Sequence, residues 1–220
     1  MEFSFVICTA GENDDAWLRV EKSIHSIQNQ HIPNCEIIVI GGNSNDSLKK
    51  HNSVRLVDWD EEAKPAWTTR KKNIGLSLSK YENVVMMHDY FELDKEWYQG
   101  FLKFGNDWDI AMTPRVMING KRQWTDWAVY GVPHHRPHHF AIRYDCKSKY
   151  QYVDGAYFVV KKLWMKSRLL NEDLVWGDPY DVEWSRKFIT EDTKLVMNTY
   201  SIVRHTKKHI NIKCKNKFLE

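Results

Sequence analysis

His88 and Asp89 place two side chains that can bind metals and move protons directly after an apolar run. The run from Val84 to Met87 is too short for a helix, and it predicts a strand buried on both faces of a mostly parallel sheet. In open α/β sheets, ligands bind beyond the carboxyl ends of the strands. We therefore expect a ligand site at this pair, although a polar turn after a strand would look the same.

The elements that must position this pair follow a βαβ order. The residues from 3 to 8 and from 35 to 40 read as buried strands, joined by a helix that Asp14 or Asp15 can cap and that carries one apolar stripe. The crossover should be right-handed. Both strands end in small or polar residues on the same edge of the sheet as His88. These residues are therefore further candidates for the ligand site. The other elements expected before residue 114 are strands at 54–57 and 109–113 and helices at 67–79 and 95–104.

The segment from 114 to 150 changes character, because periodicity fades while aromatic residues and histidines crowd together. We expect long loops and short strands lying over the sheet here, and not a separate domain. Order then returns with a strand at 152–160, a helix at 161–170, a turn at 176–181 that opens a helix, and strands at 194–197 and 201–203. The chain contains no internal repeat.

The bulk composition restricts the class of protein. The 220 residues carry a net charge of +3, which permits an anionic ligand but does not indicate a broad nucleic-acid surface. The four cysteines form no CxxC pair, and Cys8 and Cys35 are expected to be buried free thiols in a reducing compartment. We find neither a signal peptide nor a membrane-spanning run, so a soluble cytoplasmic protein is expected. The 10 Trp and 10 Tyr suit stacking on sugar rings, but they also suit an ordinary core.

Five segments in order carry a family resemblance: FVICTAGEND, EIIVIGG, KKNIGLSLSKYENVVMMHDY, DGAYFVV and WGDPYDVEWSRK. Over residues 3 to 205 the chain resembles the family 2 inverting glycosyltransferases of the GT-A fold. The resemblance implies a single α/β GT-A domain with a Rossmann-like, mostly parallel central sheet flanked by helices and a smaller acceptor-side region. Residues 1–113 would form the nucleotide-sugar-binding half, 114–206 the acceptor-binding half and 207–220 a basic tail.

The resemblance implies that the turn after the first strand holds the nucleotide base and ribose. Its residues here are Thr9, Ala10, Gly11 and Glu12, which could also form no more than a tight strand-to-helix turn. After the second strand, the family usually carries an acidic pair, and this chain has Gly41, Gly42 and Asn43 instead. Gly42 and Asn43 are still expected beside the base.

The segment Lys71-Lys72-Asn73-Ile74-Gly75 aligns with the family's Arg-Asn-x-Gly motif, near the start of a helix. The resemblance implies that Arg70 and Lys72 contact the donor diphosphate, whereas a solvated basic helix face is the alternative. His88 is also expected to contact the nucleotide.

His88-Asp89-Tyr90 falls where the family has its Asp-x-Asp metal motif, with one carboxylate left. The resemblance implies Asp89 and the late His205 as metal ligands, although His205 could be a plain histidine at a strand end. Because one ligand is a nitrogen, Mn²⁺ is expected to bind better than Mg²⁺.

The turn at 176–181 would supply the catalytic base of the resembled family. An inverting transfer needs one carboxylate to take the proton of the acceptor hydroxyl, and the motif match selects Asp181, with Asp178 in reserve. Helix capping is the alternative role of both. Trp176 would form a platform on the acceptor side, and Asp154 and Gly155 would bind hydroxyls of the donor sugar.

A run of histidines, from His134 to His139, could suggest zinc. However, Pro133 and Pro137 break any helix, and adjacent side chains of an extended strand point to opposite sides. We expect a loop that recognises the acceptor instead.

The predicted function is the inverting transfer of a sugar from a UDP-sugar to a hydroxyl of a glycan or glycoconjugate. The alternative is a GT-A module that binds nucleotide-sugar or glycan with little or no turnover, which the reduced Asp-x-Asp motif favours. A nucleotidyltransferase would need a basic Gly-rich loop after the first strand, where residues 9–15 are acidic. No nucleic-acid partner is expected, and the chain should be a monomer or a weak homodimer.

Overall fold

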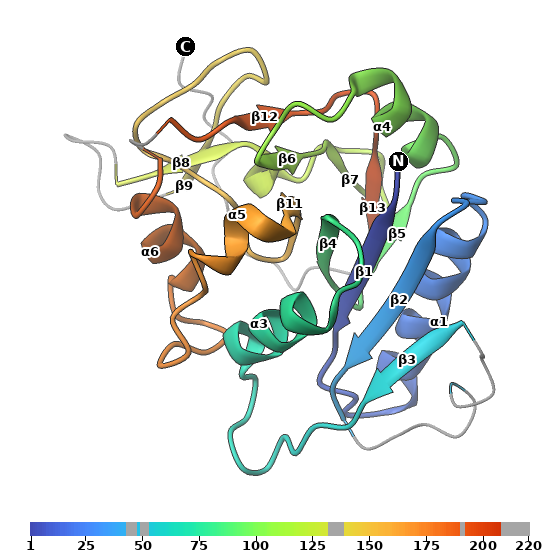
Figure 1. Ribbon diagram of the computed structural model, residues 1–220. Helices are drawn as coiled ribbons and strands as arrows, with labels where there is room; N and C mark the ends of the chain where they lie inside the picture. The colour runs from blue at the N-terminus through green and yellow to red at the C-terminus, as the bar shows by residue number, and fades with distance from the viewer. Residues whose placement is uncertain (43–47, 49–52, 132–138, 190–191, 208–220) are drawn as a thin grey trace.

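The computed structural model describes residues 1–42, 48, 53–131, 139–189 and 192–207 (Figure 1). Its centre is a seven-stranded sheet in the order β12-β6-β11-β4-β1-β2-β3. β11 is antiparallel to both of its neighbours, and the other six strands share one direction, which confirms the mostly parallel sheet. The strands are β1 (Phe3–Cys8), β2 (Cys35–Ile40), β3 (Val54–Val57), β4 (Asn83–His88), β6 (Ile110–Met112), β11 (Tyr157–Lys161) and β12 (Leu195–Met197).

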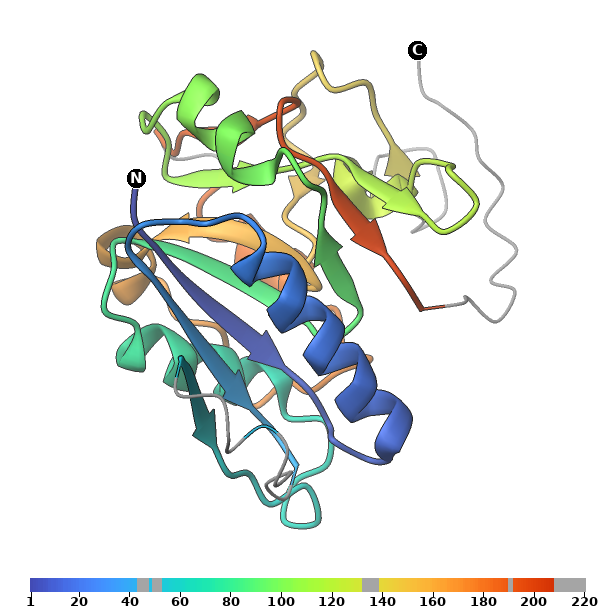
Figure 2. The ribbon, with the colours of Figure 1, turned by 90° about the vertical axis from the view of Figure 1, so that its right-hand side faces the viewer.

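Helices cover both faces of this sheet because successive strand side chains point to opposite faces. On β1, Phe3, Phe5 and Ile7 pack with α1 (Asp14–Gln28) and α4 (Trp97–Phe104). Val6 and Cys8 face the other way, toward α3 (Thr68–Leu78) and α6 (Tyr180–Arg186). Figure 2 shows α1 and α3 on opposite sides of the sheet. The expected α/β architecture is thus confirmed.

Two small sheets lie beside the central one. One has the order β10-β8-β9 and the other β5-β13-β7, and most of their residues come from the segment in which loops and short strands were expected. The short strand β5, directly after the Asp89 turn, was not expected. The remaining elements are β5 (Phe91–Leu93), β7 (Arg115–Met117), the 3-10 helix η1 (Trp124–Asp126), β8 (Ala128–Tyr130), β9 (His139–Ala141), β10 (Gln151–Tyr152), α5 (Lys162–Lys166) and β13 (Val203–His205).

Several local expectations were wrong. Asn13, and not Asp14 or Asp15, caps α1 by accepting a hydrogen bond from the Ala16 amide. The strand expected at 152–160 is divided, because the Asp154 side chain accepts from the Ala156 amide and forms a turn before β11. The helix expected at 161–170 is only the five-residue α5. Cys8 is buried, whereas Cys35 is half-buried.

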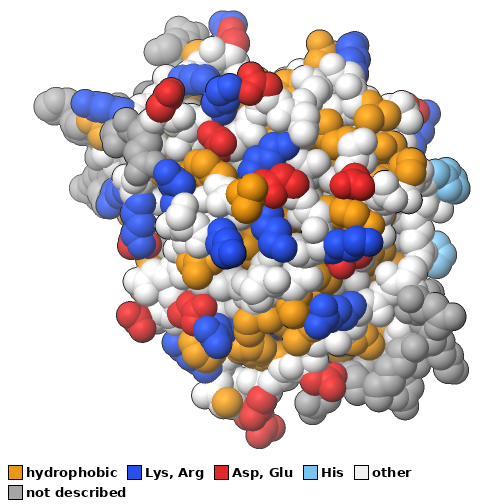
Figure 3. Space-filling view, in the orientation of Figure 1, with side chains coloured by type: hydrophobic (Ala, Val, Ile, Leu, Met, Phe, Trp, Pro, Cys, Tyr) orange, Lys and Arg blue, Asp and Glu red, His pale blue; other side chains and the backbone are white. Residues whose placement is uncertain are grey.

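β11 and β12 come from the second half of the chain and complete the sheet that the first half begins. The division at residue 113 therefore stays a prediction, as does the basic tail, of which residues 208–220 lie outside the described residues. Within the described chain, no helix is both long enough and apolar enough to cross a bilayer. On the face shown in Figure 3, basic and acidic side chains are interspersed.

Candidate active site

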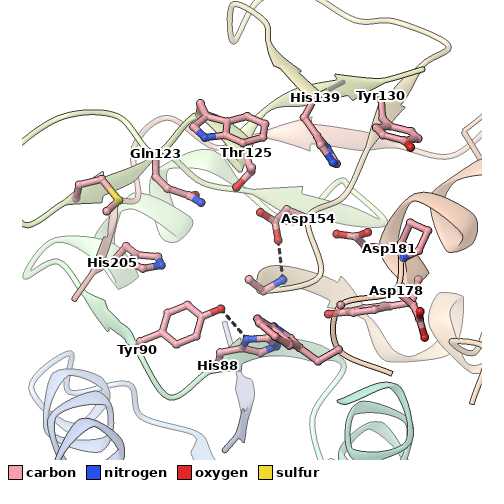
Figure 4. A pocket seen from close by; sticks show the side chains of 17 residues that line it. His88, Tyr90, Gln123, Thr125, Tyr130, His139, Asp154, Asp178, Asp181 and His205 are labelled. Carbon is pink, nitrogen blue, oxygen red and sulfur yellow. Dashed lines mark hydrogen bonds between the residues drawn. The ribbon is translucent and has the colours of Figure 1, made fainter. Parts of the chain in front are cut away.

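Two adjoining cavities open at the carboxyl ends of the parallel strands, of about 720 and about 200 Å³. His88, Tyr90 and Trp176 line both cavities, so the two form one continuous site. Figure 4 shows the larger cavity, into which side chains from both halves of the chain point. Its lining includes Gln123, Thr125, Tyr130, His139, Asp154, Asp178, Asp181 and His205.

The turns that follow β1 and β2 touch each other through two glycines. Gly11 and Gly42 have φ values of +60° and +61°, and a Cβ added to Gly11 would lie 2.9 Å from the Cα of Gly42. Only residues without a side chain can approach so closely with this backbone. Ala10 and Glu12, which follow β1, line the smaller cavity, whereas Asn43 lies outside the described residues.

Asp89 lies at the tip of β4 and is engaged by two donors. Its Oδ2 accepts a hydrogen bond from Thr9 Oγ1 at 2.9 Å and forms an ion pair with Arg19 Nη2 at 3.1 Å. Burial raises the pKa of Asp89, and the Arg19 charge and the Thr9 hydrogen bond oppose that rise. All three side chains line the smaller cavity. Asp89 therefore holds a guanidinium at the strand tip.

The three cations at the start of α3 have different environments. Arg70 is on the outer face of the helix, where it pairs with Glu172 at 2.6 Å. Lys71 lines the smaller cavity, where its Nζ donates to the carbonyl of Thr9 at 2.8 Å and pairs with Glu61. Lys72 is fully buried and lines neither cavity. Of the three, Lys71 is thus the one placed to meet a ligand.

Lys72 and His88 form a buried chain of hydrogen bonds. Lys72 Nζ contacts His88 Nε2 at 3.2 Å and donates to the Tyr180 hydroxyl at 3.0 Å, while His88 Nδ1 contacts the Tyr90 hydroxyl at 2.8 Å. Burial, followed by the Lys72 charge, lowers the pKa of His88 well below its usual value. The imidazole is therefore neutral, and since an ammonium only donates, His88 accepts at Nε2 and donates from Nδ1 to Tyr90.

Asp154 is held by a buried arginine from β7. Arg115, which is fully buried, donates from Nη1 to Asp154 Oδ2 at 2.8 Å and from Nη2 to the Tyr157 carbonyl at 2.6 Å. Burial alone would raise the pKa of Asp154, but Arg115 and the Ala156 amide outweigh it and hold the pKa below its usual value. Asp154 is therefore an ionised, fixed acceptor in the cavity wall.

Asp181, at the first turn of α6, has the opposite environment. Burial and the nearby charge of Asp154 raise its pKa to about 6, against hydrogen bonds from the Gly155 and Val182 amides at 3.2 and 2.8 Å. Its carboxyl lines the larger cavity. Asp178 also lines the cavity, but it is exposed and accepts a hydrogen bond from the Val175 amide in the turn.

Aromatic rings form the outer wall of the larger cavity. Trp176 is 62% exposed at the junction of the two cavities. His139, which also lines the larger cavity, packs against Tyr130 and Trp124, with ring centroids 4.7 and 5.5 Å apart. His139 belongs to the histidine run of the sequence, of which residues 134–138 lie outside the described residues. Such a wall offers flat apolar faces to a ligand between them.

The residues at the strand tips do not fit a divalent cation well. Among the described residues, no three His, Cys, Asp or Glu side chains gather as metal ligands. Asp89 is paired with Arg19, and both nitrogens of His88 have partners inside the protein. His205 packs against Tyr90, with ring centroids 4.7 Å apart, and lines the larger cavity, whereas Asp89 lines the smaller one. Mn²⁺ or Mg²⁺ prefers a set of oxygen ligands that this arrangement does not present.

Most of the residues expected at the site thus lie around one pair of cavities, although they come from both halves of the chain. Five of the expected residues line neither cavity: Gly11, Gly42, Arg70, Lys72 and Gly155. Sequence reasoning missed Arg19 and Arg115, and of the ring wall it named only His139, as part of the loop expected to recognise the acceptor. It also passed over Lys71, although Gly75 and Leu76, the small and apolar residues one turn later, could have indicated which face of α3 meets the sheet.

No protein-family model and no curated protein matches the sequence. Solved structures do match the fold. GalNAc-T7 with UDP, GalNAc and Mn²⁺ matches with a TM-score of 0.66 at 15% identity, over 94% of this chain and 44% of that one. TarS 1-349 of S. aureus matches with a TM-score of 0.62 at 14% identity, over 92% and 60%. Its complex with UDP-GlcNAc gives 0.62 at 15%, over 96% and 60%.

The chain spans less than two thirds of the length of these glycosyltransferase structures. At such low identity the likeness concerns the fold, and membership of family 2 stays a prediction. The seven-stranded sheet, the helices on both of its faces and these matches agree: the chain has the GT-A fold that the sequence resemblance implies.

Proposed function

We propose that the chain transfers a sugar from a UDP-sugar to a hydroxyl of a glycan or glycoconjugate, with inversion. One observation carries this proposal: Asp181, a carboxyl with a raised pKa, shares a continuous site with the strand-tip residues Thr9, Glu12 and Asp89. A base and a nucleotide pocket are the two parts that such a transfer needs, and a binding module needs only the second. The ligands of the matched structures, UDP with GalNAc and UDP-GlcNAc, are consistent with this donor class.

The donor would lie across both cavities. The base and ribose would rest on the turn of Thr9 to Glu12 and on Gly42, with the diphosphate at the junction near His88 and Tyr90. The sugar would enter the larger cavity, where Asp154, held ionised by Arg115, accepts hydrogen bonds from its hydroxyls. The Gly155 amide is already used by Asp181, so Gly155 would shape this wall and not bind the sugar directly.

The acceptor would enter between Trp176 and the ring wall of Trp124, Tyr130 and His139. Its hydroxyl attacks the anomeric carbon while Asp181 takes the hydroxyl proton, and the bond between that carbon and the phosphate oxygen breaks with its electron pair leaving on UDP. A pKa near 6 keeps Asp181 ionised at neutral pH and still basic enough to take a proton. Asp178, which is exposed and bonded within its own turn, remains the reserve.

A bound Mn²⁺ would supply charge to the leaving diphosphate. Metal dependence, which the sequence resemblance implies through Asp89 and His205, stays a prediction that the described residues do not support. No step above depends on a metal.

A panel of UDP-sugars, with GDP-sugars as controls, tests the proposal. At least one UDP-sugar should raise the melting temperature of the protein and release UDP faster when a glycan acceptor is added. Binding without any release of UDP, with every acceptor tried, would favour a GT-A module that only binds its ligand. Absence of binding to every UDP-sugar would contradict both.

A further inference from the structure

Arg19 occupies the strand tip at which a glycosyltransferase of the resembled type would hold its metal. It rises from the middle of α1, with its side chain 21% exposed, and reaches Asp89 Oδ2 at 3.1 Å and Glu12 Oε1 at 3.4 Å through a single nitrogen, Nη2. Its Nη1 donors make no hydrogen bond to the described residues, so they remain for an anion in the cavity that Arg19 lines. A guanidinium presents its donors in a planar fork that matches phosphate oxygens.

Two further cations line the same 200 Å³ cavity, Lys71 and Lys207. Lys71 is fixed by the Thr9 carbonyl and by Glu61, and the Nζ of Lys207 lies 5.7 Å from the ring centroid of Tyr90. The lining therefore holds three cations against two carboxylates, Glu12 and Asp89, and both carboxylates pair with Arg19. The remaining excess of positive charge on the lining favours an anionic ligand.

We propose that Arg19, held by Asp89 and assisted by Lys71 and Lys207, binds the donor diphosphate in place of a divalent cation. This inference rests on the proposed function, because it assigns the charge stabilisation of the same reaction. Asp89 is then a positioning residue, since its carboxylate aims the guanidinium and does not bind a metal. When the bond to the anomeric carbon breaks, the electron pair moves onto the phosphate oxygen, and the fixed cations stabilise that charge without rearranging.

The test compares UDP binding in EDTA and in Mn²⁺, using the whole chain. Calorimetry should give the same affinity for UDP in both, within about threefold, and Mn²⁺ resonance spectra should show no more bound metal with protein and UDP than with UDP alone. Uridine, which lacks phosphate, provides the reference for contacts to the base and ribose.

Variants then locate the phosphate contact. Arg19→Ala should weaken UDP binding at least tenfold and leave uridine binding within about twofold, whereas Arg19→Lys should retain part of the affinity for UDP. Lys22→Ala, an exposed cation on the same helix, is the matched control and should bind UDP as the native chain does. If Arg19→Ala does not fold because Asp89 is left without its partner, UDP binding in EDTA and in Mn²⁺, together with UDP binding by Arg19→Lys, still tests the role of Arg19.

The outcomes separate this inference from the proposed function. UDP binding that needs Mn²⁺, or that survives in Arg19→Ala, would overturn the role of Arg19 and leave the proposed transferase function standing. If UDP does not bind in either condition, the proposed function fails, and this inference fails with it. UDP binding in EDTA that is lost in Arg19→Ala and partly kept in Arg19→Lys supports this inference, and the release of UDP from a UDP-sugar then tests the proposed function.

Discussion

Asp154 and Asp181 face one cavity, yet their surroundings shift their pKa values in opposite directions. Arg115 holds Asp154 ionised, and that negative charge together with burial makes Asp181 harder to ionise. Two carboxyl groups with separated pKa values are a common basis for different roles in catalysis. Here the fixed carboxylate suits binding, and the one with the raised pKa suits proton transfer.

Replacing Asp181 tests the second role. Asp181→Asn should lower kcat by about 10²- to 10⁴-fold, the usual contribution of a general base, while UDP-sugar binding stays within a few-fold. Asp178→Asn is the matched control in the same turn and should change kcat by less than about fivefold. Turnover and calorimetric binding measure the two effects, and near-native turnover in Asp181→Asn would remove it from the base role.

The stability of the same variant should move in the opposite direction to its activity. The pKa of Asp181 is raised from 3.8 to about 6 in the folded chain. Its favourable contribution to stability is thus complete below pH 3.8 and is lost as the pH rises through 6, which costs on the order of 3 kcal/mol at pH 8. Asp181→Asn should therefore melt at an equal or higher temperature than the native chain at pH 8. A clear fall would indicate that the carboxylate is structural.

The rate should also follow the ionisation of Asp181. Because only the carboxylate can take a proton, kcat/KM should rise with pH through a midpoint near 6 and level off above 7. Burial keeps His88 neutral across this pH range, so His88 should not add a second pH-dependent change in kcat/KM. The residual kcat/KM of Asp181→Asn should not rise with pH through 6. If this rise persists in the variant, another group is responsible for the titration.

At this scale the sequence motifs locate Asp181 and Asp89 beside the cavities, while the roles of both residues stay predictions. Arg19 and Arg115 could not be predicted, because each acts on a carboxylate far away in the chain, at positions 89 and 154. Only the fold brings these pairs together. An isolated arginine within an amphipathic helix or a short strand looks like any solvated charge.

At the scale of elements, the site depends on how closely α3 packs on β1. A Cβ added to Gly75 would lie 2.2 Å from Cγ1 of Val6, so the helix rests directly on the strand and carries Lys71 and Lys72 to its tip. The sequence predicts this helix but not which of its residues lie closest to β1. Gly75 and Leu76 are buried, and Ile74 and Leu78 are partly buried and pack against the same core.

Gly75→Ala tests this packing. Alanine is the better helix former by about 1 kcal/mol, but overpacking against Val6 should outweigh this gain and destabilise the protein by roughly 1 to 3 kcal/mol. Urea unfolding measures the difference. Ser77→Ala, an exposed site on the same helix, should show no such loss.

The contact between Gly75 and Val6 can be tested further by combining Gly75→Ala with Val6→Ala, which makes room for the new methyl group. The double variant should lose less stability than the sum of the single variants, because the added methyl fills part of the space that Val6 leaves. Strict additivity would contradict a direct contact between α3 and β1.

Over the whole molecule, the sequence predicts the sheet and the helices on its faces from the buried strands and their periodicity. It does not predict how the segment from 114 to 150 folds back, since short strands such as β7 and β8 have no periodicity of their own. Their positions are determined by partners elsewhere, for example the β13 strand that joins β7 and β5. The ring wall of the larger cavity therefore becomes visible only in three dimensions.

Lys72 connects the two halves of the molecule. It comes from α3 and bonds both His88, at the tip of β4, and Tyr180, at the start of α6 and next to Asp181. Burial lowers its pKa from 10.5 to about 8. The unfolded chain therefore binds this proton more strongly, so the contribution of Lys72 to stability should rise as the pH increases from 8 toward 10.5.

Lys72→Met removes the titrating group and keeps most of its volume. The difference in unfolding free energy between the native chain and this variant should grow with pH, by on the order of 2 kcal/mol from pH 8 to pH 10. The comparison cancels the cysteines and tyrosines that titrate in the same range. Lys166→Met, an exposed cation on α5, should give a difference that does not change with pH. A flat difference for Lys72→Met as well would mean that no buried cation joins the tip of β4 to the turn that carries the base.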